Sequence, residues 1–195
     1  MRTFFVAFLL TSGLALAQQS VTLQPLTAKG RVSWAAYGTL GLPNLSGGLI
    51  SSGWGTLFNK PPEYGPHWAG FGKRYGMRLT GSATSNTMEV SLGALWGEDP
   101  RYYRLGAGES PGSRVKNALK QAFLAHDRNG KVMPAYARYA AIPGANFLSN
   151  TWRADSEAEV SHALVRTGLG FLARITSNAF AEFWPDIKGA TRRKK

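Results

Sequence analysis

The chain contains no cysteine among its 195 residues. This excludes disulfides, thiol catalysis, iron–sulfur clusters and cysteine-based zinc sites, so packing has to stabilise the fold. Acidic residues are also scarce, with 11 Asp and Glu against 23 Lys and Arg, and the formal net charge is +12. A positive charge of this size either favours anionic partners or simply keeps the protein soluble.

Residue patterns typical of catalysis or metal binding are also few. The sequence has no H-E-x-x-H motif, and its three histidines have no second histidine three or four residues away. Glu98 and Asp99 are adjacent acids, but Arg101 and Arg104 follow closely. Arginines lower the pKa of a nearby carboxyl group, whereas a general acid needs a raised pKa. We therefore predict no catalytic residue, no metal site and no cofactor.

Residues 1–17 have the pattern of a secretory signal peptide. Arg2 precedes an apolar run over 4–10, and small residues stand at positions −3 and −1 of a cleavage site between Ala17 and Gln18. The apolar run is short for a membrane anchor, although an uncleaved anchor is the alternative. The remainder suits one domain, and we expect it in the periplasm or cell envelope.

Residues 18–60 are predicted to form a polar lead-in and then an uncharged segment rich in Gly and Ser. No charged residue occurs between Ser33 and Asn59, but the hydrophobicity is too low to predict membrane insertion. We expect two short helices broken at Pro43. A β-hairpin is the alternative, because apolar residues alternate along part of 32–42.

Residues 61–187 are predicted to form a helical domain. Apolar residues recur at helical spacing over 68–83 and again over 88–96, with Gly81 as a hinge between two helices. Gly72 and Gly76 lie on the apolar face of the first helix. We expect such small residues to permit close packing between helices.

Three further helices are expected in this domain. The first begins at Ser110 and ends near Asn129, and the second lies within 133–152, broken at Pro143. A capping box from Ser156 to Glu159 should open the last helix, which Pro185 should end. The predicted fold class is all-α: a small Gly-rich bundle of about five helical segments after the signal peptide, with a basic tail at 188–195.

Two motifs in the helical domain suggest a family. Residues 98–104 read EDPRYYR and residues 182–187 read EFWPDI, while residues 68–75 add a third match. Together they resemble a group of exported bacterial proteins that share DPRY(Y/F)R and EFWPD(I/F) elements. The residues at 150–152 depart from that pattern, which has a tyrosine-rich turn there. The resemblance implies export and a common fold, and it supplies no catalytic residue.

We expect the charged residues of these motifs to stabilise the fold through ion pairs. Arg101 and Arg104 can pair with Glu98, Glu182 or Asp186. The predicted structural motif is composed of Asp99, Arg101, Arg104, Glu182 and Asp186.

The remaining cations suggest a contact with an anionic surface. The tail follows an aromatic residue that prefers membrane interfaces, and helical cations add a second basic face. The predicted contact residues are Arg74, Arg78, Trp184, Lys188, Arg192, Arg193, Lys194 and Lys195.

These observations favour a non-enzymatic envelope protein associated with an anionic membrane surface. Its expected partner is anionic lipid or an envelope polymer, and nucleic acid is not expected because the protein is exported. The alternative is an enzyme or binding protein acting on a cell-envelope polymer. A cavity lined by Glu98, Asp99 and Glu182 would favour that alternative.

Overall fold

The computed structural model describes residues 24–192, with side chains as far as Gly189. Within this range the chain forms six α-helices, three short 3₁₀ helices and one two-stranded hairpin, which confirms the all-α prediction. The predicted signal peptide, its cleavage site between Ala17 and Gln18, and the tail residues Arg193, Lys194 and Lys195 lie outside the described residues.

The uncharged segment forms α1 (Ala28–Leu40) and α2 (Leu42–Leu57). The expectation of two helices is therefore confirmed, and the β-hairpin alternative is wrong. The helices separate at Gly41, which has an extended backbone, and Pro43 lies in the first turn of α2, where proline costs no hydrogen bond. Both helices pack on α3, so they belong to the same bundle as the helices after residue 60.

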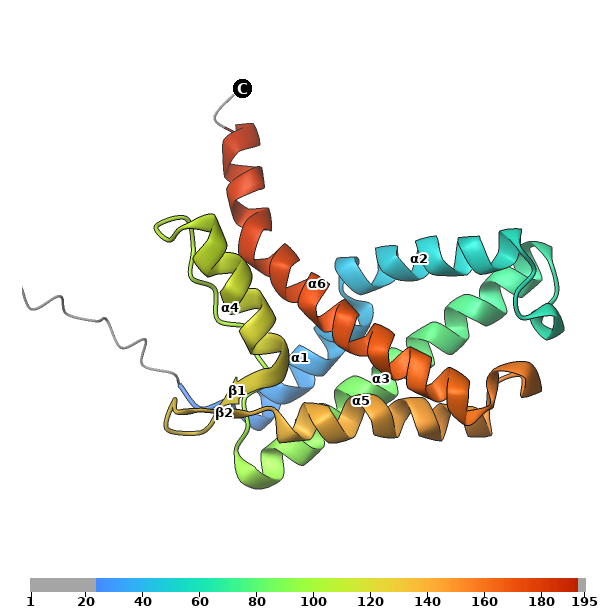
Figure 1. Ribbon diagram of the computed structural model, residues 1–195, viewed down its shortest axis with the longest axis horizontal. Helices are drawn as coiled ribbons and strands as arrows, with labels where there is room; N and C mark the ends of the chain where they lie inside the picture. Colours follow the sequence, from blue (N-terminus) through green and yellow to red (C-terminus); the bar gives the residue numbers. More distant parts are fainter. Residues whose placement is uncertain (1–23, 193–195) are drawn as a thin grey trace, which may run out of the picture.

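The next helix, α3 (His67–Trp96), follows the short helix η1 (Pro62–Tyr64) and is continuous for 30 residues. The predicted hinge at Gly81 is wrong, because the helix continues unbroken through this residue. Contacts with α1, α2 and α5 along its length place α3 at the centre of the bundle (Figure 1).

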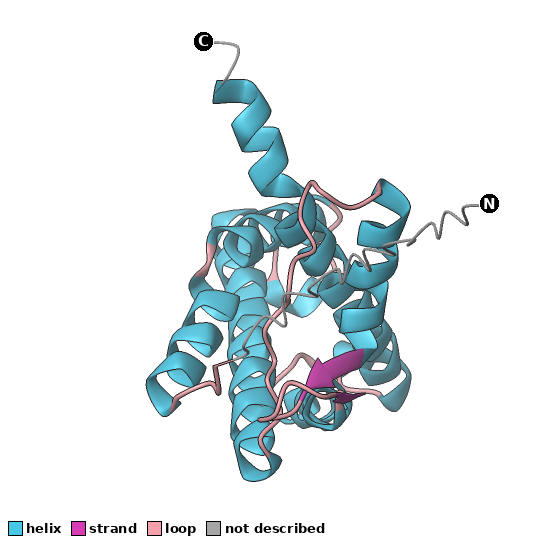
Figure 2. Cartoon of the chain, turned by 90° about the vertical axis from the view of Figure 1, so that its left-hand side faces the viewer, coloured by secondary structure: helices cyan, strands magenta, loops and turns pink. Residues whose placement is uncertain are grey.

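The predicted helix after Ser110 is α4 (Pro111–Phe123), and the Ser110 side chain caps it by accepting from the Ser113 N–H at 3.2 Å. It ends earlier than expected. The chain then forms the hairpin β1 (Leu124–His126) and β2 (Val132–Pro134), with Ala125 opposite Met133 (Figure 2).

The helix α5 (Tyr136–Leu148) contains Pro143 without a break, contrary to prediction. It is followed by η2 (Ser149–Thr151) and η3 (Asp155–Glu157), and then by α6 (Val160–Arg192). The predicted capping box is wrong: Ser156 lies inside η3 and its N–H donates to the Glu63 carboxylate, while the Glu159 carbonyl accepts the N–H of Ala163.

The last helix does not end at Pro185 but continues to Arg192. The carbonyl of Glu182, one turn earlier, accepts hydrogen bonds from Arg104 and Arg114, both at 2.7 Å. These arginines stabilise the backbone around a proline that by itself would favour a break. The helix lies against α4 and α5, and its C-terminal end projects from the body of the bundle (Figures 1 and 2).

Candidate functional site

Charged side chains occupy the centre of the molecule. The largest fully buried side chains are Arg138, Glu89, Glu98, Glu182 and Ser149, while eight of the eleven buried apolar residues are alanines. Charged groups are seldom buried unless they are paired, because removing them from water is costly. These buried polar clusters are therefore the first candidates for a functional site.

The first cluster joins three helices. Glu89 of α3 accepts from Nε of Arg138 on α5 at 2.9 Å, and also from Arg174 on α6. Arg138 also donates to the carbonyls of Gln121 and Ala122 at the end of α4. One carboxylate between two arginines leaves a net positive charge, and the neighbouring carbonyl dipoles help to stabilise it.

The second cluster unites the two sequence motifs. Glu182 accepts from the Tyr102 hydroxyl at 2.6 Å and from Nε of Arg114 at 2.8 Å, and from two backbone N–H groups in the loop after the first motif. Asp186, one turn further along α6, binds both Arg104 and Arg114. The structure thus brings Arg104, Glu182 and Asp186 together.

Burial alone would raise the pKa of Glu182. Hydrogen bonds from Tyr102, Arg114 and the backbone outweigh burial, so this pKa lies below its ordinary value. The pKa of the Tyr102 hydroxyl is raised by burial and by the adjacent carboxylate. Both groups therefore stay in the ionisation states that suit a structural hydrogen bond.

The other two predicted motif residues form a separate cluster. Asp99 forms a bidentate pair with Arg101 and accepts from the Tyr103 hydroxyl at 2.8 Å. The ring of His126 packs edge-on against Tyr103, and its backbone is bridged to Asp99. Burial would raise the pKa of Asp99, but Arg101 and Tyr103 hold this pKa below its ordinary value, which does not suit a general acid.

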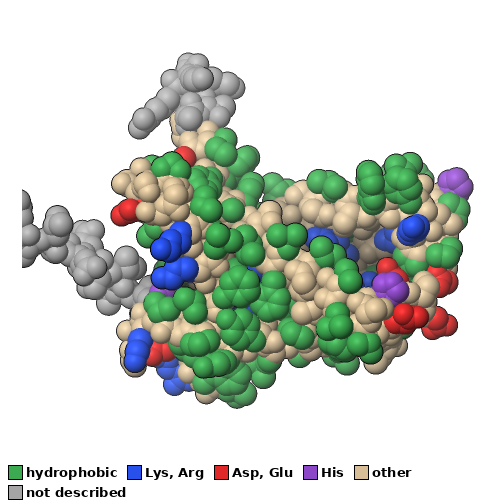
Figure 3. Space-filling view, viewed as in Figure 1, with side chains coloured by type: hydrophobic (Ala, Val, Ile, Leu, Met, Phe, Trp, Pro, Cys, Tyr) green, Lys and Arg blue, Asp and Glu red, His purple; other side chains and the backbone are tan. Residues whose placement is uncertain are grey.

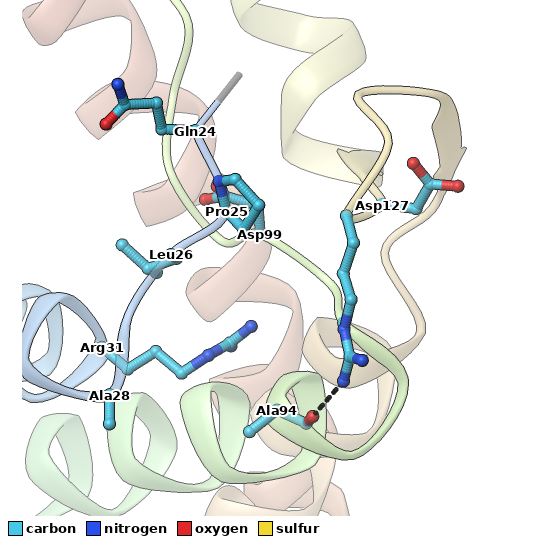
Figure 4. Close-up of a pocket in the computed structure, with 10 residues that line it drawn as sticks. Gln24, Pro25, Leu26, Ala28, Arg31, Ala94, Asp99 and Asp127 are labelled. Carbon is cyan, nitrogen blue, oxygen red and sulfur yellow. Dashed lines mark hydrogen bonds between the residues drawn. The ribbon is translucent and has the colours of Figure 1, made fainter. Parts of the chain in front are cut away.

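A cavity of about 270 Å³ opens beside Asp99, between the start of α1 and the end of α3 (Figure 4). Arg31 crosses this region and donates to the carbonyls of Val90 and Glu98, while Arg128 donates to the Ala94 carbonyl. Of the three acids that would favour an enzyme on an envelope polymer, only Asp99 lines the cavity.

The remaining side-chain arrangements among the described residues give little support for metal binding or catalysis. Within residues 24–192, no three His, Asp or Glu side chains lie close enough to hold a metal ion. Ser113 and Lys116 have S-x-x-K spacing on α4, but both are exposed, and the Ser113 hydroxyl bonds only to that of Ser110.

The exterior is unusually apolar for a chain with a charged interior. Large apolar side chains are exposed on every helix, and in Figure 3 they cover much of the face formed by α5 and α6 and the outer side of α2. On α6 the inward positions include Arg166, Gly170 and Arg174, whereas most of the large side chains at outward positions are apolar. These exposed residues of α6 are Val160, Leu164, Val165, Leu169, Leu172, Phe180, Trp184 and Ile187.

One predicted surface cation lies in the interior. Arg74 is buried and donates to the carbonyls of Lys60, Pro61 and Gly65, all within 2.8 Å, and to the side chain of Asn59. Its assignment to an anionic-surface contact is therefore wrong. These carbonyls belong to the turn before α3. The helical spacing of the sequence does not reveal that Arg74 binds them.

The other predicted surface residues differ in exposure. Arg78 is half-buried against α2, and its Nε has no hydrogen-bond partner among the described residues. Trp184 and Lys188 are exposed near the end of α6. Arg192 lies at the last residue of that helix. Arg78 thus lies on α3, whereas Trp184, Lys188 and Arg192 lie on α6.

Comparison with known proteins gives no match: no family model, no curated protein and no solved structure is significantly similar to this chain. Among the described residues, no helix is both long enough and apolar enough to cross a membrane.

Proposed function

We propose that the chain is a non-enzymatic, exported protein of the cell envelope that lies on a membrane surface. The observation that carries this proposal is the inverted distribution of its side chains, with charged clusters inside and large apolar residues outside. An exposed apolar surface of this extent typically marks a contact with lipid or with another protein.

The export part of the proposal rests on the sequence. Residues 1–17 have the charge, apolar run and small residues of a signal peptide. The net charge of +12 favours a surface that carries anionic lipid or another envelope polyanion. The resemblance to exported bacterial proteins with the same two motifs supports the same location.

The interior also supports a structural role for the acids. Asp99 and Glu182, two of the acids whose presence around one cavity would favour the enzymatic alternative, are bound to arginines and tyrosines in separate clusters. Their lowered pKa values favour ion pairs over proton transfer. The cavity beside Asp99 is the feature that favours the enzymatic alternative.

Cell fractionation tests the proposal. The full chain should be expressed in a Gram-negative host, and its membranes washed first with 1 M salt and then with alkaline carbonate. We expect the mature protein, beginning at Gln18, to resist the salt wash and to leave the membrane in carbonate. Recovery in the cytosol with Met1 retained would contradict export, and recovery in the periplasmic fluid would contradict membrane association.

A further inference from the structure

The helix α2 turns most of its large side chains away from the protein. Leu42, Ile50 and Leu57 are each at least 75 % exposed, and Trp54 is 67 % exposed. Positions 50, 54 and 57 follow helical spacing and therefore form one continuous face. A helix on the surface of a water-soluble bundle normally has the opposite orientation, with its apolar face inward.

The inner face of α2 consists mainly of small residues. Gly48 and Ser52 are buried, and a Cβ atom at Gly48 would lie 2.8 Å from the ring of Tyr75 on α3. At Gly55 it would lie 3.0 Å from the side chain of Arg74. Small residues that let helices approach closely, with large ones facing outward, are the packing pattern of helices surrounded by lipid.

The outer face of α2 is also uncharged over its whole length, because the chain carries no charged residue from Ser33 to Asn59. Exposed cations, Lys60 and Lys73, follow it in the sequence, on the turn and on the first turns of α3. The acid in that turn, Glu63, accepts a hydrogen bond from the Ser156 N–H.

Aromatic residues lie where α2 meets α3. Trp54 packs on Phe58 with ring centroids 4.7 Å apart, and Trp68, in the first turn of α3, is 84 % exposed. The short helix η1 reverses the chain, so the end of α2 and the start of α3 lie at the same end of the molecule (Figure 1). Tryptophan prefers the boundary between acyl chains and headgroups, and nearby lysines suit the phosphates.

We infer that α2 lies in the plane of the membrane interface, with the face formed by Leu42, Leu49, Ile50, Trp54 and Leu57 among the acyl chains. This inference rests on the proposed membrane association and names the element that carries it. With 16 residues α2 is about 24 Å long, shorter than a bilayer core of about 30 Å. Both of its ends are also joined to packed helices, so it lies along the surface. Apolar burial dominates the contact, which therefore forms on neutral lipid and persists in salt.

The test measures flotation of the mature chain with phosphatidylcholine vesicles in 0.5 M salt. Ile50→Gln/Leu57→Gln should weaken partitioning roughly tenfold or more, since two large apolar side chains would no longer be buried among the acyl chains. The matched control is Leu164→Gln/Leu169→Gln, which changes two exposed leucines of α6 and should leave partitioning within about twofold of the wild type. All these side chains are exposed, so both variants should keep the wild-type circular dichroism spectrum.

A second measurement locates the helix in the bilayer. Brominated acyl chains should quench the tryptophan fluorescence of the bound wild type. Most of this quenching should be lost in Trp54→Phe/Trp68→Phe and retained in Trp184→Phe, whose tryptophan lies on α6.

The outcomes separate the inference from the proposed function. Loss of binding in the α6 control but not in the α2 variant would overturn the inference and leave membrane association intact. A wild type that binds no vesicles would overturn both. A third outcome is a wild type that binds no vesicles but sediments as a dimer, and that becomes monomeric with Ile50→Gln/Leu57→Gln. This outcome would assign the face to a contact with a second copy of the chain.

Discussion

Arg138 of α5 donates from Nε to Glu89 of α3 at 2.9 Å, and both side chains are at most 2 % exposed. Arg174 of α6 binds the second oxygen of the same carboxylate. A single acid thus holds three helices together at the centre of the bundle. In a core that otherwise contains mainly alanine, this cluster gives the helices a specific register.

Removing Glu89 should destabilise the fold more than removing a surface charge. Glu89→Leu leaves two arginines inside the protein without a counter-charge, which typically costs about 3–5 kcal/mol. Urea unfolding should show this loss, while Lys120→Met, at an exposed position of α4, should change stability by less than about 0.5 kcal/mol. Equal unfolding midpoints for the two variants would show that the cluster does not stabilise the fold.

Two arginines of α3 should respond differently to the same substitution. Arg74→Met removes hydrogen bonds to three carbonyls of the preceding turn and should destabilise by about 2–4 kcal/mol. Arg78→Met removes a cation whose Nε is buried without a partner, so it should be neutral or slightly stabilising. Thermal unfolding of the two variants checks the order, and a larger loss for Arg78→Met would contradict it.

Substitutions of glycine on α2 and on α3 should also have different effects on stability. Gly48→Leu would force a side chain against Tyr75 and should cost about 1–3 kcal/mol. The Gly76 position is open, and a Cβ there would meet nothing within 4 Å, so Gly76→Ala should stabilise α3 by about 0.5–1 kcal/mol. The sequence-based expectation that Gly72 and Gly76 pack against a helix is wrong, because both positions are open. Destabilisation by Gly76→Ala would argue against this placement.

Acid should destabilise the fold in two stages. Burial lowers the pKa of His126 below its ordinary 6.5 despite nearby acids, so the unfolded chain binds a proton first and stability falls as pH drops below about 6.5. The lowered pKa values of Glu182 and Asp99 add stability above their ordinary values, and this stability is lost as pH falls through the folded values.

Urea unfolding between pH 7.5 and 3.5 measures both stages. His126→Gln should remove the upper stage and leave the lower one. A stability that rises on acidification from pH 7 to 5 would contradict the assignment of a neutral imidazole in the folded protein.

The basic tail should add a salt-sensitive component to membrane binding. Each cation near an anionic surface contributes about 1 kcal/mol within roughly a Debye length. A chain ending at Ile187 lacks Lys188, Arg192, Arg193, Lys194 and Lys195. It should float less well than the full chain with vesicles containing phosphatidylglycerol at low salt, and equally well at high salt. Equal flotation under both conditions would exclude the tail from the contact.

Sequence patterns predicted several local features correctly. The N-cap at Ser110, the two helices in the uncharged segment and the all-α class depend on residues close together in the chain, which is why spacing was sufficient. The pairing of Arg104 with an acid of the second motif could be proposed, since two motifs with complementary charges suggested it.

Other features depended on contacts that spacing does not encode. The apolar periodicity of residues 68–96 indicated which residues share a face, but not whether that face is buried. Trp68 begins the apolar pattern predicted over 68–83, and yet its side chain is 84 % exposed. In a soluble protein an apolar face is assumed to point inward, and this chain departs from that assumption.

The sequence by itself determined the helical class, the positive charge, the lack of thiol chemistry and the signal-peptide pattern, because composition and short-range spacing are sufficient for each. Tertiary structure alone decided which side of each helix is inside. That choice depended on carbonyl oxygens of the turn before α3 binding Arg74, and on Glu89 binding arginines from two other helices, contacts between residues far apart in the chain. Once those charges were buried, steric fit required the small residues of α2 to face α3, and its large apolar side chains were left on the outside.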